Sequence, residues 1–106
     1  MFGSNYQGEE RRGAERHQIR LSATLRASGG RRVTVEVRDI SLLGFCCEYA
    51  STLQIGELMW LKFADHDSLE VVVARRDGFY YGLTFVRPLH VSTLDHLVAR
   101  YSKAAA

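Results

Sequence analysis

The chain has 106 residues, of which 46% are apolar and 25% charged, a balance typical of one globular domain. Its apolar runs are far shorter than the roughly 20 residues of a transmembrane helix, and its first residues lack the basic-then-apolar order of a secretion signal. We therefore expect a cytoplasmic protein without membrane insertion. The adjacent Cys46 and Cys47 would point to opposite faces of a strand and could not easily bridge each other. We therefore expect them to be reduced thiols.

Positive charge is concentrated in the first part of the chain. Residues 1–38 contain eight arginines and four acids, whereas residues 39–106 contain six basic and eight acidic residues. The planar fork of arginine suits bidentate contacts to phosphate or guanine, and it also stacks on bases. A biased genome composition produces the same arginine excess, so the count alone leaves both interpretations open.

The N-terminal half predicts a leader followed by a hairpin. Residues 1–10 have no alternating apolar pattern, and we expect them to form a flexible leader. From residue 19 to residue 27 apolar and polar side chains alternate, which is the period of a half-buried strand. Residues 28–30 supply a turn, and the alternation resumes at residues 33–37. The two segments therefore read as an antiparallel hairpin.

Four further short strands are predicted after this hairpin. They cover residues 45–49, 58–63, 69–76 and 80–86, and the last two flank the tight-turn pair Asp77-Gly78. Six short strands within about 70 residues indicate a small antiparallel barrel or sandwich.

The pattern becomes helical after Pro88. The apolar residues then have the i, i+3, i+4, i+7 spacing of an amphipathic helix: Leu94, Leu97, Val98 and Tyr101. Ser92 and Asp95 have the spacing of a capping box. We expect this helix to pack on the barrel and to complete a single domain over residues 11–103, followed by a frayed end at 104–106.

Two polar clusters stand where strands begin and end. Arg12 and Arg16 precede the first strand and are close enough to converge on one anion if the segment forms a turn. The second cluster occupies the predicted loop from Asp39 to Gly44, where Asp39 and Ser41 would project to the same side. Gly44 would permit a special backbone geometry or a close ligand approach. Each cluster also has a structural interpretation, as a solvated basic segment or as side chains that cap their own turn.

Together these clusters resemble the signature motifs of the PilZ domain family of bacterial cyclic di-GMP receptors: Arg12-x-x-x-Arg16 and, about 23 residues later, Asp39-x-Ser41-x-x-Gly44. The resemblance runs from about Arg11 to Tyr101, and Arg11 supplies the doubled arginine often seen in the family. It implies an all-β fold, a six-stranded antiparallel PilZ-like barrel with one C-terminal helix. It also implies that cyclic di-GMP binds on the outer face, with a flexible N-terminal arm folding over it.

The resemblance further implies a ligand-binding set: Arg11, Arg12, Arg16, Asp39, Ser41 and Gly44. Guanine presents O6 and N7 acceptors to an arginine fork and N–H donors to an acceptor such as Asp39. The family pattern gives phosphate, guanine-edge and stacking contacts to the arginines, base recognition to Asp39 and Ser41, and close approach to Gly44. Further candidates with a weaker claim are Arg38, Arg75 and Arg76.

No catalytic centre, metal or cofactor is expected. The four histidines are scattered without metal-ligand spacing, and no glycine-rich loop joins a strand to a helix. Two alternatives to a receptor remain, a PilZ-like protein adaptor that binds no nucleotide and a small-barrel binder of single-stranded nucleic acid. The second fits less well because the arginines cluster in the leader, so we expect no DNA or RNA partner.

Signalling is expected to depend on a protein partner. We find no output domain in the sequence, so a bound nucleotide would act by changing the surface of this domain. Residues 1–16 lack the apolar periodicity that would tie them to the barrel, and we expect the ligand to order this arm. The identity of the partner stays open, and the sequence is compatible with a monomer or a weak dimer.

Overall fold

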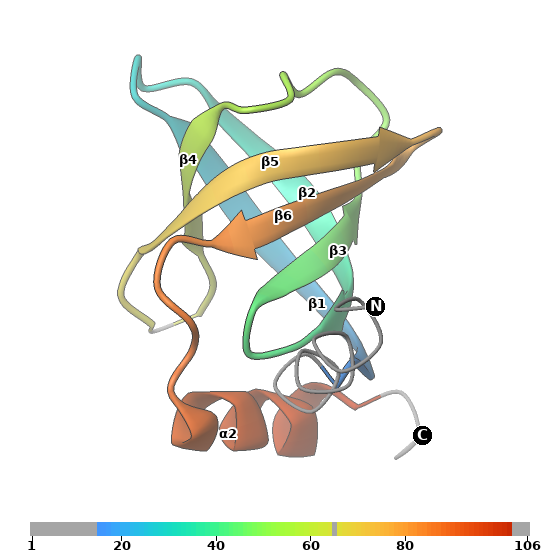
Figure 1. Ribbon diagram of the computed structural model, residues 1–106, viewed down its shortest axis with the longest axis vertical. Coiled ribbons are helices and arrows are strands. Elements are labelled where there is room, and N and C mark those ends of the chain that lie inside the picture. Colours follow the sequence, from blue (N-terminus) through green and yellow to red (C-terminus); the bar gives the residue numbers. More distant parts are fainter. Residues whose placement is uncertain (1–14, 65, 103–106) are drawn as a thin grey trace, which may run out of the picture.

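A computed structural model describes residues 15–64 and 66–102 of the chain, and within them six strands form a closed antiparallel barrel followed by one helix (Figure 1). In chain order the elements are β1 (His17–Ala27), β2 (Arg32–Ile40), β3 (Gly44–Glu48), β4 (Leu58–Lys62), β5 (Leu69–Asp77), β6 (Tyr80–Phe85) and α2 (Val91–Tyr101). Around the barrel the order is β1-β2-β3-β6-β5-β4. The predicted all-β barrel with a C-terminal helix is confirmed. The predicted leader, residues 1–14 of the arm and the frayed end lie outside the described residues.

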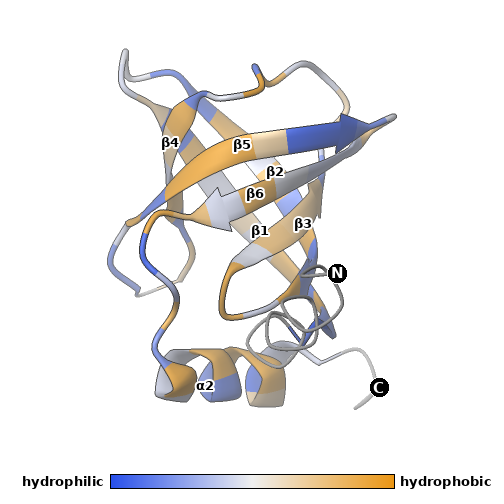
Figure 2. Cartoon of the chain, in the orientation of Figure 1, coloured by the Kyte–Doolittle hydropathy of each residue, from blue (hydrophilic) through white to orange (hydrophobic). Residues whose placement is uncertain are grey.

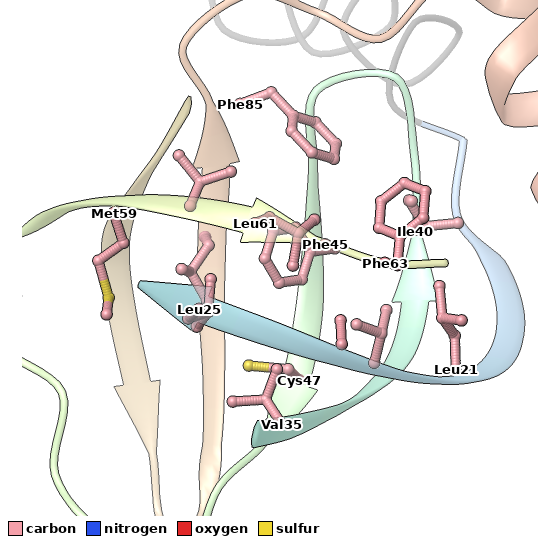
Figure 3. Packing of buried hydrophobic residues seen from close by; sticks show 14 of the residues in the cluster. Leu21, Leu25, Val35, Ile40, Phe45, Cys47, Met59, Leu61, Phe63 and Phe85 are labelled. Atoms are coloured by element: carbon pink, nitrogen blue, oxygen red, sulfur yellow. The ribbon is translucent and has the colours of Figure 1, made fainter. Parts of the chain in front are cut away.

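Alternation of apolar and polar residues produces the barrel wall. Along β1 every second residue from Ile19 to Ala27 is buried, and the residues between them face outward. The inward side chains of the strands fill the interior, as Figure 3 shows for residues such as Leu25, Phe45 and Leu61. Closure pairs every strand on both sides, so the sheet has no open edge.

Three register irregularities interrupt the regular pairing of the described strands, one of them on β1 between Gln18 and Leu21, and the other two are the β-bulges that concern the outer wall. One lies on β2 between Val37 and Asp39, and the other lies on β5 between Val73 and Arg75. Figure 2 shows β5 turning from hydrophobic to hydrophilic toward its C-terminal end, where its last four residues are exposed. Bulges redirect side chains and bend the strand that carries them. Here they turn charged residues onto the outer wall next to β3 and β6.

The C-terminal helix packs across one end of the barrel (Figure 1). It buries Leu94 and Leu97, and it begins at Val91 after the N-cap residue His90. The imidazole Nδ1 of His90 accepts a hydrogen bond from the backbone N–H of Ser92 at 3.2 Å. The predicted capping box is therefore wrong, because Ser92 already lies inside the first turn. Within the described ranges, no helix has the length and apolar character needed to cross a membrane.

Both ends of α2 are attached to the barrel by backbone contacts. The N–H of Leu89, just before the helix, donates to the carbonyl of Leu42 at 2.8 Å. Ser102, just after the helix, pairs with Ile19 in an isolated antiparallel bridge. The helix is thus held between the start of β1 and the turn that connects β2 to β3.

Candidate functional site

The outer wall opposite β1 carries a transverse row of polar and small residues. Strand register places side by side Asp39 on β2, Cys46 on β3, Gly82 on β6 and Arg75 on β5. Neighbouring strands lie about 5 Å apart, so the row brings four chain segments into one small area. The two bulges border this row on either side.

Arg16 and Asp39 join the two sequence clusters. The guanidinium Nη1 of Arg16 lies 3.2 Å from a carboxylate oxygen of Asp39, across 23 residues of sequence. The Arg16 side chain is 55% exposed and that of Asp39 is 23% exposed. An ion pair this open to solvent contributes at most about 1 kcal/mol to stability. Both groups therefore remain able to exchange partners with a charged ligand.

The second cluster forms a tighter turn than predicted. Asp39 and Ile40 belong to β2 and Gly44 opens β3, so the predicted loop from Asp39 to Gly44 is reduced to residues 41–43. Ser41 is buried, and its hydroxyl oxygen accepts from the N–H groups of Leu43 at 3.1 Å and Gly44 at 3.2 Å. The same hydroxyl lies 3.3 Å from the Gly44 carbonyl, to which it donates. In this structure Ser41 holds the turn in shape by bonding its own backbone.

Gly44 is needed for a close approach between strands. A Cβ atom built at this position would lie 2.3 Å from the carbonyl oxygen of Leu83 on β6. Because that neighbour is backbone, it has little freedom to move aside. The close neighbour of Gly44 is thus β6 itself, which brings the β2–β3 turn firmly against the row.

A pocket of about 240 Å³ covers the turn and the part of the row on β6 and β5, and Asp39 and Cys46 lie beside it rather than in its lining. Its lining combines both sequence clusters with residues of β5 and β6: Arg16, Ser41, Leu43, Gly44, Phe45, Ala74, Arg75, Gly82, Leu83 and Thr84. The Arg75 side chain lies across Gly82, since a Cβ at Gly82 would be 2.8 Å from the Arg75 Nε. The pocket therefore has a guanidinium on each side, Arg16 near β1 and Arg75 on β5.

Charged groups surround the thiol of Cys46 in the middle of the row. Burial raises the pKa of Cys46, and the Asp39 carboxylate raises it further, while the guanidinium groups of Arg75, Arg16 and Arg38 act in the opposite direction. Cys47 points into the barrel, where burial is the main cause that raises its pKa to about 12. Both cysteines are free and face opposite sides of β3. Cys46 is thus a neutral, partly exposed group in the row, next to the pocket.

The other candidate arginines have different surroundings. Arg38 forms an ion pair with Glu48 at 2.7 Å, and the Arg76 guanidinium lies 5.4 Å from the centre of the Tyr81 ring. Neither residue lines the pocket. Arg11 and Arg12 lie outside the described residues. Within the described ranges, no group of three metal-ligating side chains is present.

Sequence reasoning did not identify Cys46 or Gly82 as parts of this surface. A signal existed for Cys46, because it follows Gly44 by two residues on the same strand and so faces the same side. Gly82 had no comparable signal, since its place beside Cys46 depends on the pairing of β3 with β6.

These features define a small β-barrel binding domain whose charged site lies on the outer wall. A family model described as PilZ domain matches residues 10–102, and the chain belongs to this family. PilZ domains are binding domains found in cyclic di-GMP receptors.

Among solved structures, the chain is similar to the PilZ domain of CeSA from a cellulose-synthesizing bacterium, with a TM-score of 0.58 and 14% identity. That similarity covers 80% of this chain and 91% of the other, and it concerns the fold. A comparison with curated proteins gives no match.

Proposed function

We propose that this protein is a cyclic di-GMP receptor that binds the nucleotide on the outer wall formed by β2, β3, β6 and β5. The observation that carries the proposal is the meeting of Arg16 and Asp39, one from each signature motif, beside a pocket lined by both motifs. Because the chain belongs to the PilZ family, we interpret the contact between Arg16 and Asp39 as part of a cyclic di-GMP site.

The chemistry of the site suits a guanine dinucleotide. The Asp39 carboxylate accepts the N–H donors on the Watson–Crick edge of guanine, taking them in exchange for part of its contact with Arg16. Arg16 and Arg75, on opposite sides of the pocket, supply forks for phosphate oxygens and for O6 and N7 of guanine. Ser41 and Gly44 keep the turn pressed against β6, which fixes the position of Asp39.

The pocket holds only part of such a ligand. Its volume of about 240 Å³ is below the range of roughly 300–1,000 Å³ that is usual for small-molecule sites. We propose that Arg11 and Arg12 cover the remainder, as the family pattern implies, and that the arm becomes ordered when it does so. The ordered arm would then present or conceal a surface that a protein partner recognises.

Calorimetric titration with cyclic di-GMP tests the binding itself, with GMP and cyclic GMP as controls. We expect saturable binding of cyclic di-GMP, weaker binding of both controls, and loss of affinity as salt rises, because a dianion meets exposed guanidinium groups. Absence of binding at low salt would contradict the proposal and favour the adaptor function.

Two matched pairs of variants test the assignment of residues. Arg16→Ala and Asp39→Ala should each lose about 1.5–3 kcal/mol of binding free energy, the usual contribution of a hydrogen bond to a charged group. The controls Arg20→Ala and Glu36→Ala remove a different ion pair, which joins β1 to β2 over 3.8 Å and lies outside the pocket. The controls should bind like the parent. Equal affinities in all four variants would contradict the assignment even if cyclic di-GMP binds.

Hydrogen exchange of residues 5–18, with and without cyclic di-GMP, tests the ordering of the arm. We expect residues 5–16 to be protected only in the presence of the ligand, whereas residues 17 and 18 belong to β1 and are paired with β2 in both states. The same exchange rates in both states would show that signalling uses another element.

A further inference from the structure

A second charged surface lies on the opposite wall of the barrel. The strand register places Arg32 on β2, Arg26 on β1 and Trp60 on β4 in one outward row. A groove of about 220 Å³ follows this row, and we name it the cationic groove by its lining residues: Thr24, Arg26, Arg32, Trp60, Lys62 and Ser68. In the ring of six strands β1 and β4 lie opposite β6 and β3, so the groove faces away from the proposed nucleotide site.

The positive charges of the cationic groove are not neutralised by ion pairs. Among residues 15–64 and 66–102, the four ion pairs involve other arginines, namely Arg16, Arg20, Arg31 and Arg38. Arg26 and Arg32 stand directly opposite each other on antiparallel strands, an arrangement in which like charges destabilise the sheet. The ammonium of Lys62 donates to the carbonyl of His66, which leaves its charge uncompensated. Folding therefore gains little from these three cations.

Trp60 gives the groove an apolar floor that holds one of its cations in place. The Arg26 guanidinium lies 4.9 Å from the centre of the Trp60 ring, in a cation–π contact. A guanidinium that lies over an aromatic ring keeps its N–H groups available, and these can donate two hydrogen bonds to one carboxylate. Arginine and tryptophan are also the residues that contribute most to protein–protein binding energy.

We infer that the cationic groove docks an acidic segment of a protein partner, with carboxylates on Arg26, Arg32 and Lys62. Charge complementarity supports this occupant, and the neighbouring Glu70, paired with Trp60, would repel a misplaced carboxylate and so help to fix the register. Single-stranded nucleic acid fits less well. Trp60 is the one tryptophan of the chain, and Arg26 already lies over its ring, so a base that stacked on this face would have to displace the guanidinium. The inference does not depend on cyclic di-GMP binding.

Fluorescence provides the test, because a single tryptophan reports on the groove alone. The probe is a dye-labelled octaglutamate peptide titrated against the whole protein, with octaglutamine and oligo-dT of equal length as comparisons. We expect saturable anisotropy for octaglutamate together with a change in Trp60 emission, and no saturation for octaglutamine. Absence of saturable octaglutamate binding at low salt would overturn the inference, and tighter binding of oligo-dT would assign the groove to nucleic acid instead.

Paired variants distinguish the groove from general positive charge. The double variant Arg26→Gln with Arg32→Gln should weaken octaglutamate binding by about tenfold or more. The control is Arg20→Gln with Arg100→Gln, which removes the same charge from exposed positions outside the groove and should change the affinity by less than about twofold. Equal weakening by the two double variants would overturn the inference, since it would show attraction to net charge alone.

Discussion

Gly44 contributes to the site through the absence of a side chain. Its Cβ position lies 2.3 Å from the Leu83 carbonyl, so Gly44→Ala must push β3 away from β6. We expect a loss of about 1–3 kcal/mol or more in the free energy of unfolding, as for overpacked interiors. Gly29→Ala is the control, because Gly29 has no atom within 4 Å of its Cβ position and does not have positive φ. Urea denaturation should separate the two variants, and equal midpoints would show that the strand contact is unimportant.

Cys46 offers a chemical probe of the proposed site. The thiolate is the reactive form, and burial raises the pKa of both thiols, so both should react more slowly than a free cysteine. We expect a thiol reagent at pH about 8.5 to modify partly exposed Cys46 in the folded protein, and Cys47 only after unfolding. Cyclic di-GMP should protect Cys46, as peptide mass spectrometry would show. Modification of Cys46 at the same rate with saturating ligand would place the nucleotide elsewhere.

The candidate site was predictable where its residues are close in sequence. Asp39, Ser41 and Gly44 lie on one short turn, and their spacing carried the resemblance to PilZ domains. The bonds of the Ser41 hydroxyl to its own turn were foreseen only as the structural interpretation of that motif. Gly82 and the orientation of Arg75 were beyond sequence reasoning because they depend on register across β5 and β6 and on a bulge.

Among the elements, the strands were predicted well because the alternation of apolar and polar residues fixes which side chains face the core. A shift by one residue would turn the apolar face of β1 toward water. Boundaries were harder to predict where a motif continues a strand, so β2 extends through Asp39 and Ile40 into the predicted loop. The helix start was misplaced because histidine is not among the usual N-cap residues, whereas Ser92 is of a favoured type.

The cap at His90 has a measurable effect on α2. His90→Ala removes the acceptor for the Ser92 N–H, and we expect a loss of about 1 kcal/mol in stability, typical of N-cap replacement. His96→Ala is the matched control on the exposed face of the same helix, where alanine is the better helix former. Thermal unfolding followed by circular dichroism should show a lower midpoint for His90→Ala alone. Equal midpoints would mean that the cap contributes nothing.

At the scale of the whole molecule, closure of the barrel places the two proposed binding surfaces on opposite walls. The proposed nucleotide site lies on β2, β3, β6 and β5, whereas the cationic groove lies on β2, β1 and β4. Every strand has a paired neighbour on both sides, so neither surface contains an edge strand. A partner on one wall therefore leaves the other wall accessible.

The attachment of α2 at both ends makes the helix part of the same energetic unit as the two motifs. Leu42, which holds the start of the helix, belongs to the turn between Ser41 and Gly44, and Ile19, which holds its end, follows Arg16 by three residues. Detaching the helix therefore requires loosening both segments that carry the proposed site. By linkage, a ligand that stabilises those segments raises the free energy of helix opening, by up to about 2.7 kcal/mol at a concentration of 100 times Kd.

Amide exchange of α2 measures this linkage, although no described residue of the helix lines the pocket. Saturating cyclic di-GMP should slow exchange across residues 94–101 as well as in β3. Protection of β3 with unchanged exchange in α2 would show that the two attachments open independently. If the linkage holds, the free energy needed to detach α2 rises with the concentration of the nucleotide. A protein that binds only the detached helix would then bind more weakly as the nucleotide concentration increases.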